Sequence, residues 1–334
     1  MTSAQNRHHA RVALSAVLIG LGSTGVVFLQ PALTGAQAIR WTEEARTVPL
    51  PPGIPLRVVN LLGDVEVRSG TEPGAVLHIR RQVPPGPEIP DEEIDRAMPV
   101  EVVTGGERVE VRVPRRPLSG WDEPGGGTRR HLRLRIELPA DHPLEVETSS
   151  GSISVVGIEG PMILDTVDGR LEVRDTGREV RLGTMTGDIV LERSPFGADV
   201  NTVSGDVRIT GAGGGITVTC VSGDIVIEEA RAVSVRASNT GGNITYEGTL
   251  APDGSYRLSS HSGDILFRIH GPQGARVQLS TFSGSISVPL DFVLTGERTS
   301  RRGLEGTIGS GEAYIELTGF SGNLVLYGPV PPHP

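Results

Sequence analysis

A short phrase recurs at a fixed interval through the second half of the chain. It reads MTGDIVL at residues 185–191, VSGDVRI at 203–209 and VSGDIVI at 221–227, so each copy begins 18 residues after the previous one. Its glycine recurs at the turn anchors Gly151, Gly169, Gly187, Gly205, Gly223, Gly242, Gly263 and Gly284, with further copies at Gly63, Gly311 and Gly322. Self-similarity at such a period is typical of a repeat architecture.

The residues on both sides of each glycine are apolar at every second position. In the repeat of Gly205 these positions hold Ala198 and Val200 before the glycine and Val207 and Ile209 after it. A period of two indicates a strand with one buried face, so each repeat is predicted to be strand, turn and strand. One repeat buries too little apolar surface to fold alone, and stacking is required. The sequence therefore predicts an all-β fold: a parallel β-solenoid (β-helix-like) of about 8 rungs, with repeats of about 18–21 residues, over residues 141–328.

The turn residues have local roles in this interpretation. Glycine permits a positive φ, and the neighbouring Ser, Thr or Asp can hydrogen-bond nearby backbone. Three residues before the glycine lies a column of small polar residues: Thr148, Thr166, Thr184, Thr202, Cys220, Asn239, Ser260 and Thr281. We expect these side chains to point inward and their hydroxyls to bond between rungs. Cys220, the only cysteine, is interpreted as a small packed residue that forms no intramolecular disulfide.

Residues 39–140 do not follow the repeat. They contain strand-like runs at 56–67, 76–82, 100–113 and 131–138, separated by two long loops at 84–99 and 114–130. We expect a β-rich N-terminal region that caps the first rung and covers its open edge. The last strand-like runs, 313–318 and 323–327, are expected to close the other end, and residues 329–334 form a tail.

Residues 1–38 have the pattern of a signal peptide. Arg7 and Arg11 precede an apolar run over residues 12–29, and Ala36-Gln37-Ala38 offers a cleavage site. The run is long, so a retained membrane anchor stays an alternative. We therefore predict export to the periplasm, the cell surface or the extracellular space. The net charge of −9 argues against nucleic acid, and against attraction to anionic lipid through bulk charge.

The residue after the glycine forms a candidate metal site, the Asp ladder of Asp188, Asp206, Asp224 and Asp264. The 18-residue period is similar to that of calcium-binding β-rolls, but the glycine spacing of those turns is absent. Turn geometry therefore explains the ladder better, and we predict neither a metal nor another cofactor.

The same inspection predicts no catalytic residues. The carboxylates Asp175, Glu192, Glu228 and Glu229 show no convergent pair, and the histidines have no zinc-site spacing. The arginine pairs at 80–81, 115–116, 129–130 and 301–302 leave binding of anionic glycans as an alternative.

Longer segments carry a resemblance to a known family. They are VVNLLGDVEV, HLRLRIELPADHPLEVETSSGSISV, the TxSGD motifs and GSGEAYIELTGFSGNLVL, which together span most of residues 56–328. With them the chain resembles the bacterial putative-adhesin family of Ser-Gly-Asp β-strand repeats, a domain-of-unknown-function family. The resemblance implies an exported or envelope-associated β-solenoid with an adhesive or envelope role, and it brings no catalytic residues.

The leading hypothesis is an exported, non-enzymatic β-solenoid for recognition, adhesion or envelope scaffolding. Its expected partner is a glycan or protein of the cell envelope. A membrane-tethered accessory of envelope stress signalling is one alternative, and it requires a retained leader. A carbohydrate-active β-helix enzyme is another.

Overall fold

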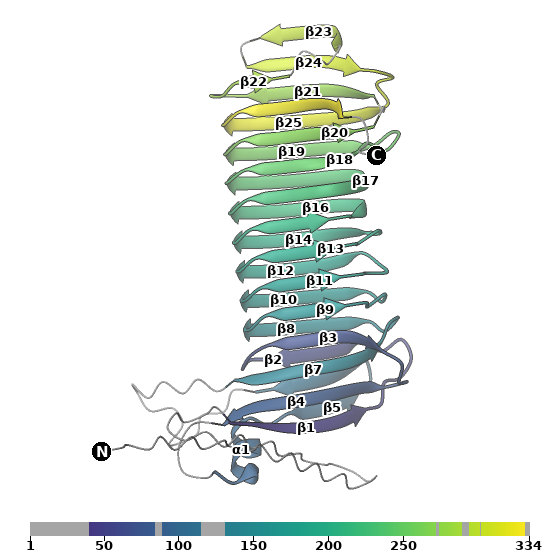
Figure 1. Cartoon of the computed structure of the whole chain (residues 1–334), viewed down its shortest axis with the longest axis vertical. Helices are drawn as coiled ribbons and strands as arrows, with labels where there is room; N and C mark the ends of the chain where they lie inside the picture. The colour runs from purple at the N-terminus through teal and green to yellow at the C-terminus, as the bar shows by residue number, and fades with distance from the viewer. Residues whose placement is uncertain are drawn as a thin grey trace, which may run out of the picture.

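Stacked strands make up most of the part of the chain that the structure describes. The computed structural model describes residues 40–83, 89–114, 131–271, 274–288, 294–300 and 302–330, so the predicted leader lies outside the described residues. The strands form a tall column with two facing walls, called wall A and wall B here (Figure 1). A rung is one strand of wall B joined through a glycine turn to one strand of wall A.

Wall B contains, from the lower end of Figure 1 upward, β5 (Glu101–Gly105), β6 (Arg108–Val113), β2 (Leu56–Asn60), β8 (Leu144–Ser150), β10 (Met162–Asp168), β12 (Val180–Thr186), β14 (Gly197–Ser204), β16 (Gly213–Ser222), the second half of β17 (Ile225–Gly241), β19 (Ser255–Ser262), β25 (Ala313–Ser321), β21 (Ala275–Thr281), β24 (Gly303–Ile308) and β23 (Leu294–Ser300). Wall A contains, in the same direction, β1 (Arg40–Val48), β4 (Ala75–Val83), β7 (Leu132–Pro139), β3 (Val65–Gly70), β9 (Ile153–Val156), β11 (Leu171–Arg174), β13 (Ile189–Glu192), β15 (Val207–Thr210), the first half of β17, β18 (Ile244–Thr249), β20 (Ile265–His270), β26 (Leu324–Val330) and β22 (Ile286–Ser287).

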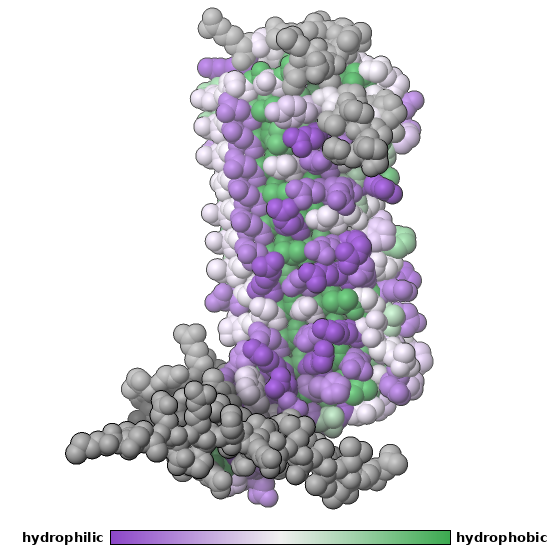
Figure 2. Space-filling view, in the orientation of Figure 1, coloured by the Kyte–Doolittle hydropathy of each residue, from purple (hydrophilic) through white to green (hydrophobic). Residues whose placement is uncertain are grey.

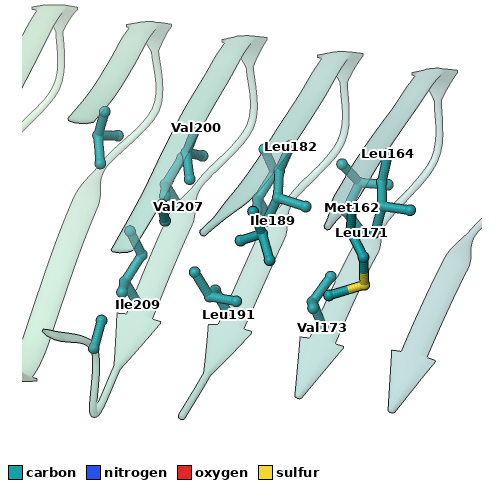
Figure 3. Close-up of a cluster of buried hydrophobic side chains, with 14 of the residues drawn as sticks. Met162, Leu164, Leu171, Val173, Leu182, Ile189, Leu191, Val200, Val207 and Ile209 are labelled. Carbon is teal, nitrogen blue, oxygen red and sulfur yellow. The ribbon is translucent and has the colours of Figure 1, made fainter. Parts of the chain in front are cut away.

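The repeats stack in parallel and in register. Val207 of β15 is the Cα partner of Ile225 in β17, and Val200 of β14 is the partner of Val218 in β16. All four side chains are buried, and side chains of the two walls meet between the sheets (Figure 3). The predicted all-β, parallel solenoid-like architecture is therefore confirmed, with its core between the two walls.

The lower end contains a rung that the sequence interpretation assigned to the capping region. β2 pairs in parallel with β8, and β3 pairs in parallel with β9, so the repeat of Gly63 stacks directly on that of Gly151. β6 and β7 extend the two walls in parallel, and the antiparallel β5, β4 and β1 complete this end.

A short helix, α1 (Asp91–Ala97), lies in the segment predicted to be a loop. Pro90 precedes it, its first turn holds Asp91, Glu92 and Glu93, and Ile94 and Ala97 are buried. A proline and acidic residues favour a helix N-terminus, but two turns are too few to produce a clear helical period. No helix among the described residues is long and apolar enough to cross a membrane.

At the upper end of the column, a second expectation from the sequence is wrong. The C-terminal strands do not close the column: β25 lies between β19 and β21, and β26 lies between β20 and β22 (Figure 1). The antiparallel β24 and β23 continue wall B beyond β21 instead. Because the segment 313–330 carries the same apolar pattern as the other repeats, it fits into the middle of the array as well as at its end.

The turn glycines are required mainly by close packing between rungs. A Cβ at Gly187 would clash with the carbonyl of Gly169, and the same contact repeats at each predicted anchor from Gly151 to Gly284. Positive φ, the predicted reason, applies to Gly187, Gly205, Gly223, Gly242 and Gly263, with values of 139–152°. It is not observed at Gly151, Gly169 or Gly284.

The small polar column before the turns is buried, as predicted. The hydroxyl of Thr148 donates to Thr166 at 2.8 Å, and Ser260 donates to the carbonyl of Gly242 in the neighbouring rung at 3.2 Å. Cys220 occupies a threonine position, with its sulfur 3.7 Å from the carbonyl oxygens of Gly205 and Gly223. The expectation that this column bonds between rungs is therefore confirmed for Thr148, Thr166 and Ser260, whereas the buried hydroxyls of Thr184 and Thr202 have no hydrogen-bond partner among the described residues.

Candidate functional site

The Asp ladder lies on the turn edge of the column, and its carboxylates bind backbone amides. Oδ1 of Asp188 accepts the N–H of Asp206 at 3.0 Å, and Oδ1 of Asp206 accepts the N–H of Asp224 at 2.9 Å. Asp224 accepts the N–H of Asn243 at 2.8 Å. Each carboxylate thus caps the next rung, which is a structural use of the side chain.

Neutral side chains perform the same task in this ladder. Asn243 Oδ1 accepts the N–H of Asp264 at 3.0 Å, and Asp264 in turn accepts the N–H of Asn323 at 2.7 Å. The position after the turn glycine therefore requires a hydrogen-bond acceptor, and it does not require a negative charge. Among the described residues, no group of three or more His, Cys, Asp or Glu side chains is placed to hold a metal ion.

The four carboxylates that were considered for catalysis are spread over three rungs of wall A: Asp175 follows β11, Glu192 ends β13, and Glu228 and Glu229 are neighbours in β17. Three of them are ion-paired: Asp175 with Arg193 at 2.9 Å, Glu192 with Arg174 at 3.0 Å and Glu228 with Arg208 at 2.6 Å. The hydrogen bond from Arg193 lowers the pKa of Asp175. Ion-paired carboxylates of this kind form a polar outer surface, and Figure 2 shows hydrophilic residues covering much of one long face.

A different column on the turn edge is exposed and largely apolar. It consists of the residues two positions before the turn glycines above Gly151 and is called the turn-edge ridge: Val167, Met185, Val203, Val221, Thr240, His261, Phe320 and Phe282, in stacking order. Met185 is 56% exposed, Phe320 47% and Phe282 57%. The sequence analysis did not identify this ridge, although its residues could have been recognised because each lies two positions before a turn glycine. Exposed apolar side chains in a continuous row mark a candidate interaction surface.

The upper part of the ridge is an aromatic stack of His261, Phe320 and Phe282. The ring centroids of His261 and Phe320 are 4.6 Å apart with planes 10° apart, and those of Phe320 and Phe282 are 4.9 Å and 6° apart. The guanidinium of Arg302 lies over Phe282, 5.1 Å from its centroid. The stack exists because β25 inserts between β19 and β21 and brings Phe320 between the other two rings.

Beside the aromatic stack, a groove opens on the outer face of wall B. This C-terminal groove has a volume of about 500 Å³ and is lined by the stack, Arg302 and a row of hydroxyl side chains. The row, called the hydroxyl column, consists of Ser238, Ser259, Thr318 and Ser280. None of these four hydroxyls has a hydrogen-bond partner among the described residues, so all are free to bind a ligand.

The arginine pairs that were considered for glycan binding have different positions. Arg81 is buried, donates to the carbonyl of Met98 at 2.9 Å and pairs with Glu44 at 3.0 Å, which is a structural role. Arg80 pairs with Glu43 at 2.8 Å. The pairs at 115–116 and 129–130, and residue 301, lie outside the described residues. Arg302 has no acidic partner within the described ranges, and it lines the C-terminal groove.

Fold and site together define a two-walled parallel β-solenoid with a ligand-sized groove on one wall. The chain belongs to the Toastrack DUF4097 family, whose model matches residues 104–326. The predicted resemblance is thereby shown at the level of this domain-of-unknown-function family.

Three of the solved structures to which the chain is similar are the following bacterial proteins. A putative adhesin from Bacteroides fragilis is 13% identical, with 85% of this chain and 96% of that chain covered and a TM-score of 0.39. A putative cell adhesion protein from Clostridium sporogenes is 10% identical, with 86% and 99% covered and a TM-score of 0.25. A putative lipid binding protein from Parabacteroides distasonis is 10% identical, with 86% and 96% covered and a TM-score of 0.32. No curated protein matches the sequence.

Proposed function

We propose that this chain is an exported, non-enzymatic recognition protein that binds a component of the cell envelope. The observation that carries the proposal is the turn-edge ridge, in which four exposed aliphatic side chains and, beyond Thr240, three stacked aromatic rings lie at the rung spacing. Rungs are about 4.8 Å apart, so the ridge offers a ligand a contact at regular intervals along a straight line. Such a surface suits an extended ligand with a repeating structure.

The leader pattern supports export in this proposal. A protein that reaches the envelope meets polysaccharides and surface proteins, which are extended and repetitive. The intact mass of the exported protein tests this part: loss of about 38 residues is expected for a cleaved signal peptide. A retained leader would favour the membrane-tethered accessory instead.

A binding screen tests the function itself. The purified exported protein is incubated with immobilised envelope polysaccharides and surface proteins, and every retained component is afterwards analysed for cleavage. The proposal predicts retention of at least one component without release of reducing ends or unsaturated sugars. Retention of nothing would contradict the recognition function, and cleavage of a bound glycan would instead identify an enzyme.

A further inference from the structure

We propose that the C-terminal groove is a binding site for an acidic polysaccharide, that is, a glycan chain that carries carboxylate groups. This inference rests on the proposed recognition function and assigns to it a place and a chemical class of ligand. Three features of the groove support it: the aromatic stack along one side, the hydroxyl column on its surface and, at its upper end, Arg302, which has no acidic partner in the part of the chain that the structure describes.

The aromatic stack offers a rigid apolar strip. Its rings cover one another's faces, because adjacent planes are within 10° of parallel and adjacent centroids within 4.9 Å. Their edges remain open to solvent, as the exposure of Phe320 and Phe282 indicates. The apolar parts of sugar rings can make van der Waals contact with these edges, and the strip is preorganised by the strands that carry it.

The hydroxyl column supplies the polar contacts that a sugar needs. Each Ser or Thr hydroxyl is both a donor and an acceptor, as is each sugar hydroxyl, so the two sets can pair in either direction. The four hydroxyls occur on adjacent strands, β17, β19, β25 and β21, at the rung interval. An extended glycan lying along the column axis would meet one of them at every step.

Arg302 favours an acidic sugar over a neutral one. Its guanidinium lies over Phe282 and has no acidic partner among the described residues, in a chain whose net charge is −9. A planar guanidinium binds a carboxylate through two parallel hydrogen bonds, which gives both affinity and orientation. The groove therefore combines an apolar side, neutral hydroxyls and one cation, which matches a polyuronate.

An extended peptide fits this surface less well. Peptides in extended conformation commonly bind by adding a strand to an open sheet edge. Here β19, β25 and β21 each pair with a strand on both sides, so the groove offers no free backbone edge.

Calorimetric titration with polygalacturonate, alginate and hyaluronate tests the inference. Fully methyl-esterified polygalacturonate serves as the neutral control, since it has the same backbone without the charge. We expect at least one polyuronate to bind the full exported protein. Arg302→Gln should weaken that binding about tenfold or more and remove the preference over the ester. Phe320→Ala should weaken binding of both forms.

Phe196→Ala is the matched control, because it removes a similarly exposed phenylalanine ring (62% exposed) outside both the ridge and the groove and should leave affinity unchanged. Thermal unfolding of each variant shows whether it is folded. Two results would overturn the assignment: absence of binding to all three polyuronates, or binding that Arg302→Gln and Phe320→Ala leave intact. The recognition function would survive either result if the envelope screen still retained a component, so the two failures are distinguishable.

Discussion

At the residue scale, the Gly-Asp turn is explained by contacts between rungs. The glycine allows the backbones of successive turns to approach, since a Cβ at Gly205 would clash with the carbonyl of Gly187. The aspartate accepts the next turn's N–H, as Asp206 does from Asp224 at 2.9 Å. Both residues are therefore determined by stacking, and neither needs a ligand to explain it.

Two substitutions of Asp224 separate the effect of its hydrogen-bond acceptor on stability from the effect of its negative charge. Asp224→Ala removes the acceptor for the N–H of Asn243 and should reduce the free energy of unfolding by about 0.5–1.5 kcal/mol. Asp224→Asn keeps an acceptor and relieves repulsion from Asp206, so it should be at least as stable as the wild type. Urea unfolding of the three proteins measures the difference. Equal destabilisation by both substitutions would contradict the acceptor role.

The same variants test whether the Asp ladder binds calcium. Because the carboxylate oxygens already bind amides, calcium should not change the unfolding midpoint relative to EDTA in the wild type. A midpoint that rises with calcium in the wild type, but not in Asp224→Asn, would contradict the structural interpretation.

Cys220 should be a poorly reactive thiol. Burial raises the pKa of Cys220, and the nearby charges of Asp206 and Asp224 add to the rise. The folded protein therefore retains the thiol proton at a pH where the unfolded chain, with a thiol pKa of about 8.5, loses it. The thiol's contribution to stability is complete below that pH and decreases as the pH rises toward the folded pKa.

Reaction with a disulfide reagent at pH 8 measures this directly. We expect the native protein to react at least tenfold more slowly than the protein in denaturant, because the native thiol is both protonated and buried. Equal rates in the two states would mean that the polar column is open to solvent.

At the element scale, the notable feature is the insertion of β25 and β26. The period of the sequence predicts which residues form strands and which of them face the core, because both follow from an alternation of two. The period does not predict the order of the strands along the column, because every repeat carries the same apolar columns and these do not distinguish one neighbour from another. Leu317, for example, pairs with Leu258 on one side and Leu279 on the other.

A chain ending after Gly311 lacks both inserted strands. Because β25 and β26 form the parallel contacts between the rung of Gly263 and that of Gly284, the segment 275–308 should lose its attachment to the array. We expect hydrogen exchange in 275–308 to approach that of unfolded chain, while strands β8 to β16 keep their protection. In the truncated protein, wild-type protection of 275–308 together with an unchanged spin-label distance between positions 147 and 280 would contradict the observed strand order, whereas a distance shorter by one step of about 4.8 Å would mean that the repeat of Gly284 had moved into the vacant place.

The candidate site shows the same limit of sequence reasoning. The ridge could have been identified, because Val203 and Val221 occupy the same position relative to their glycines. The aromatic stack could not, because His261 and Phe282 are consecutive in the repeat order and Phe320 enters between them only in the folded chain. The role of Arg302 also depends on the β21–β24 pairing.

At the scale of the whole molecule, the two walls form one continuous array with a shared core. Its proposed ligand surfaces are columns along the stacking axis, so a change in strand order would rearrange every column at the upper end. The central claim is therefore that the repeats stack in register, with the C-terminal repeat inserted below that of Gly284.

Electron–electron distances between spin labels test this claim most directly. One label replaces Glu147, and a second replaces Ser259, Thr318 or Ser280, all in one column of wall B, in a Cys220→Ser background. The stacking predicts distances of about 29, 34 and 38 Å respectively, from six, seven and eight steps of about 4.8 Å. A distance to Thr318 longer than that to Ser280, or distances unrelated to the number of steps, would contradict the account.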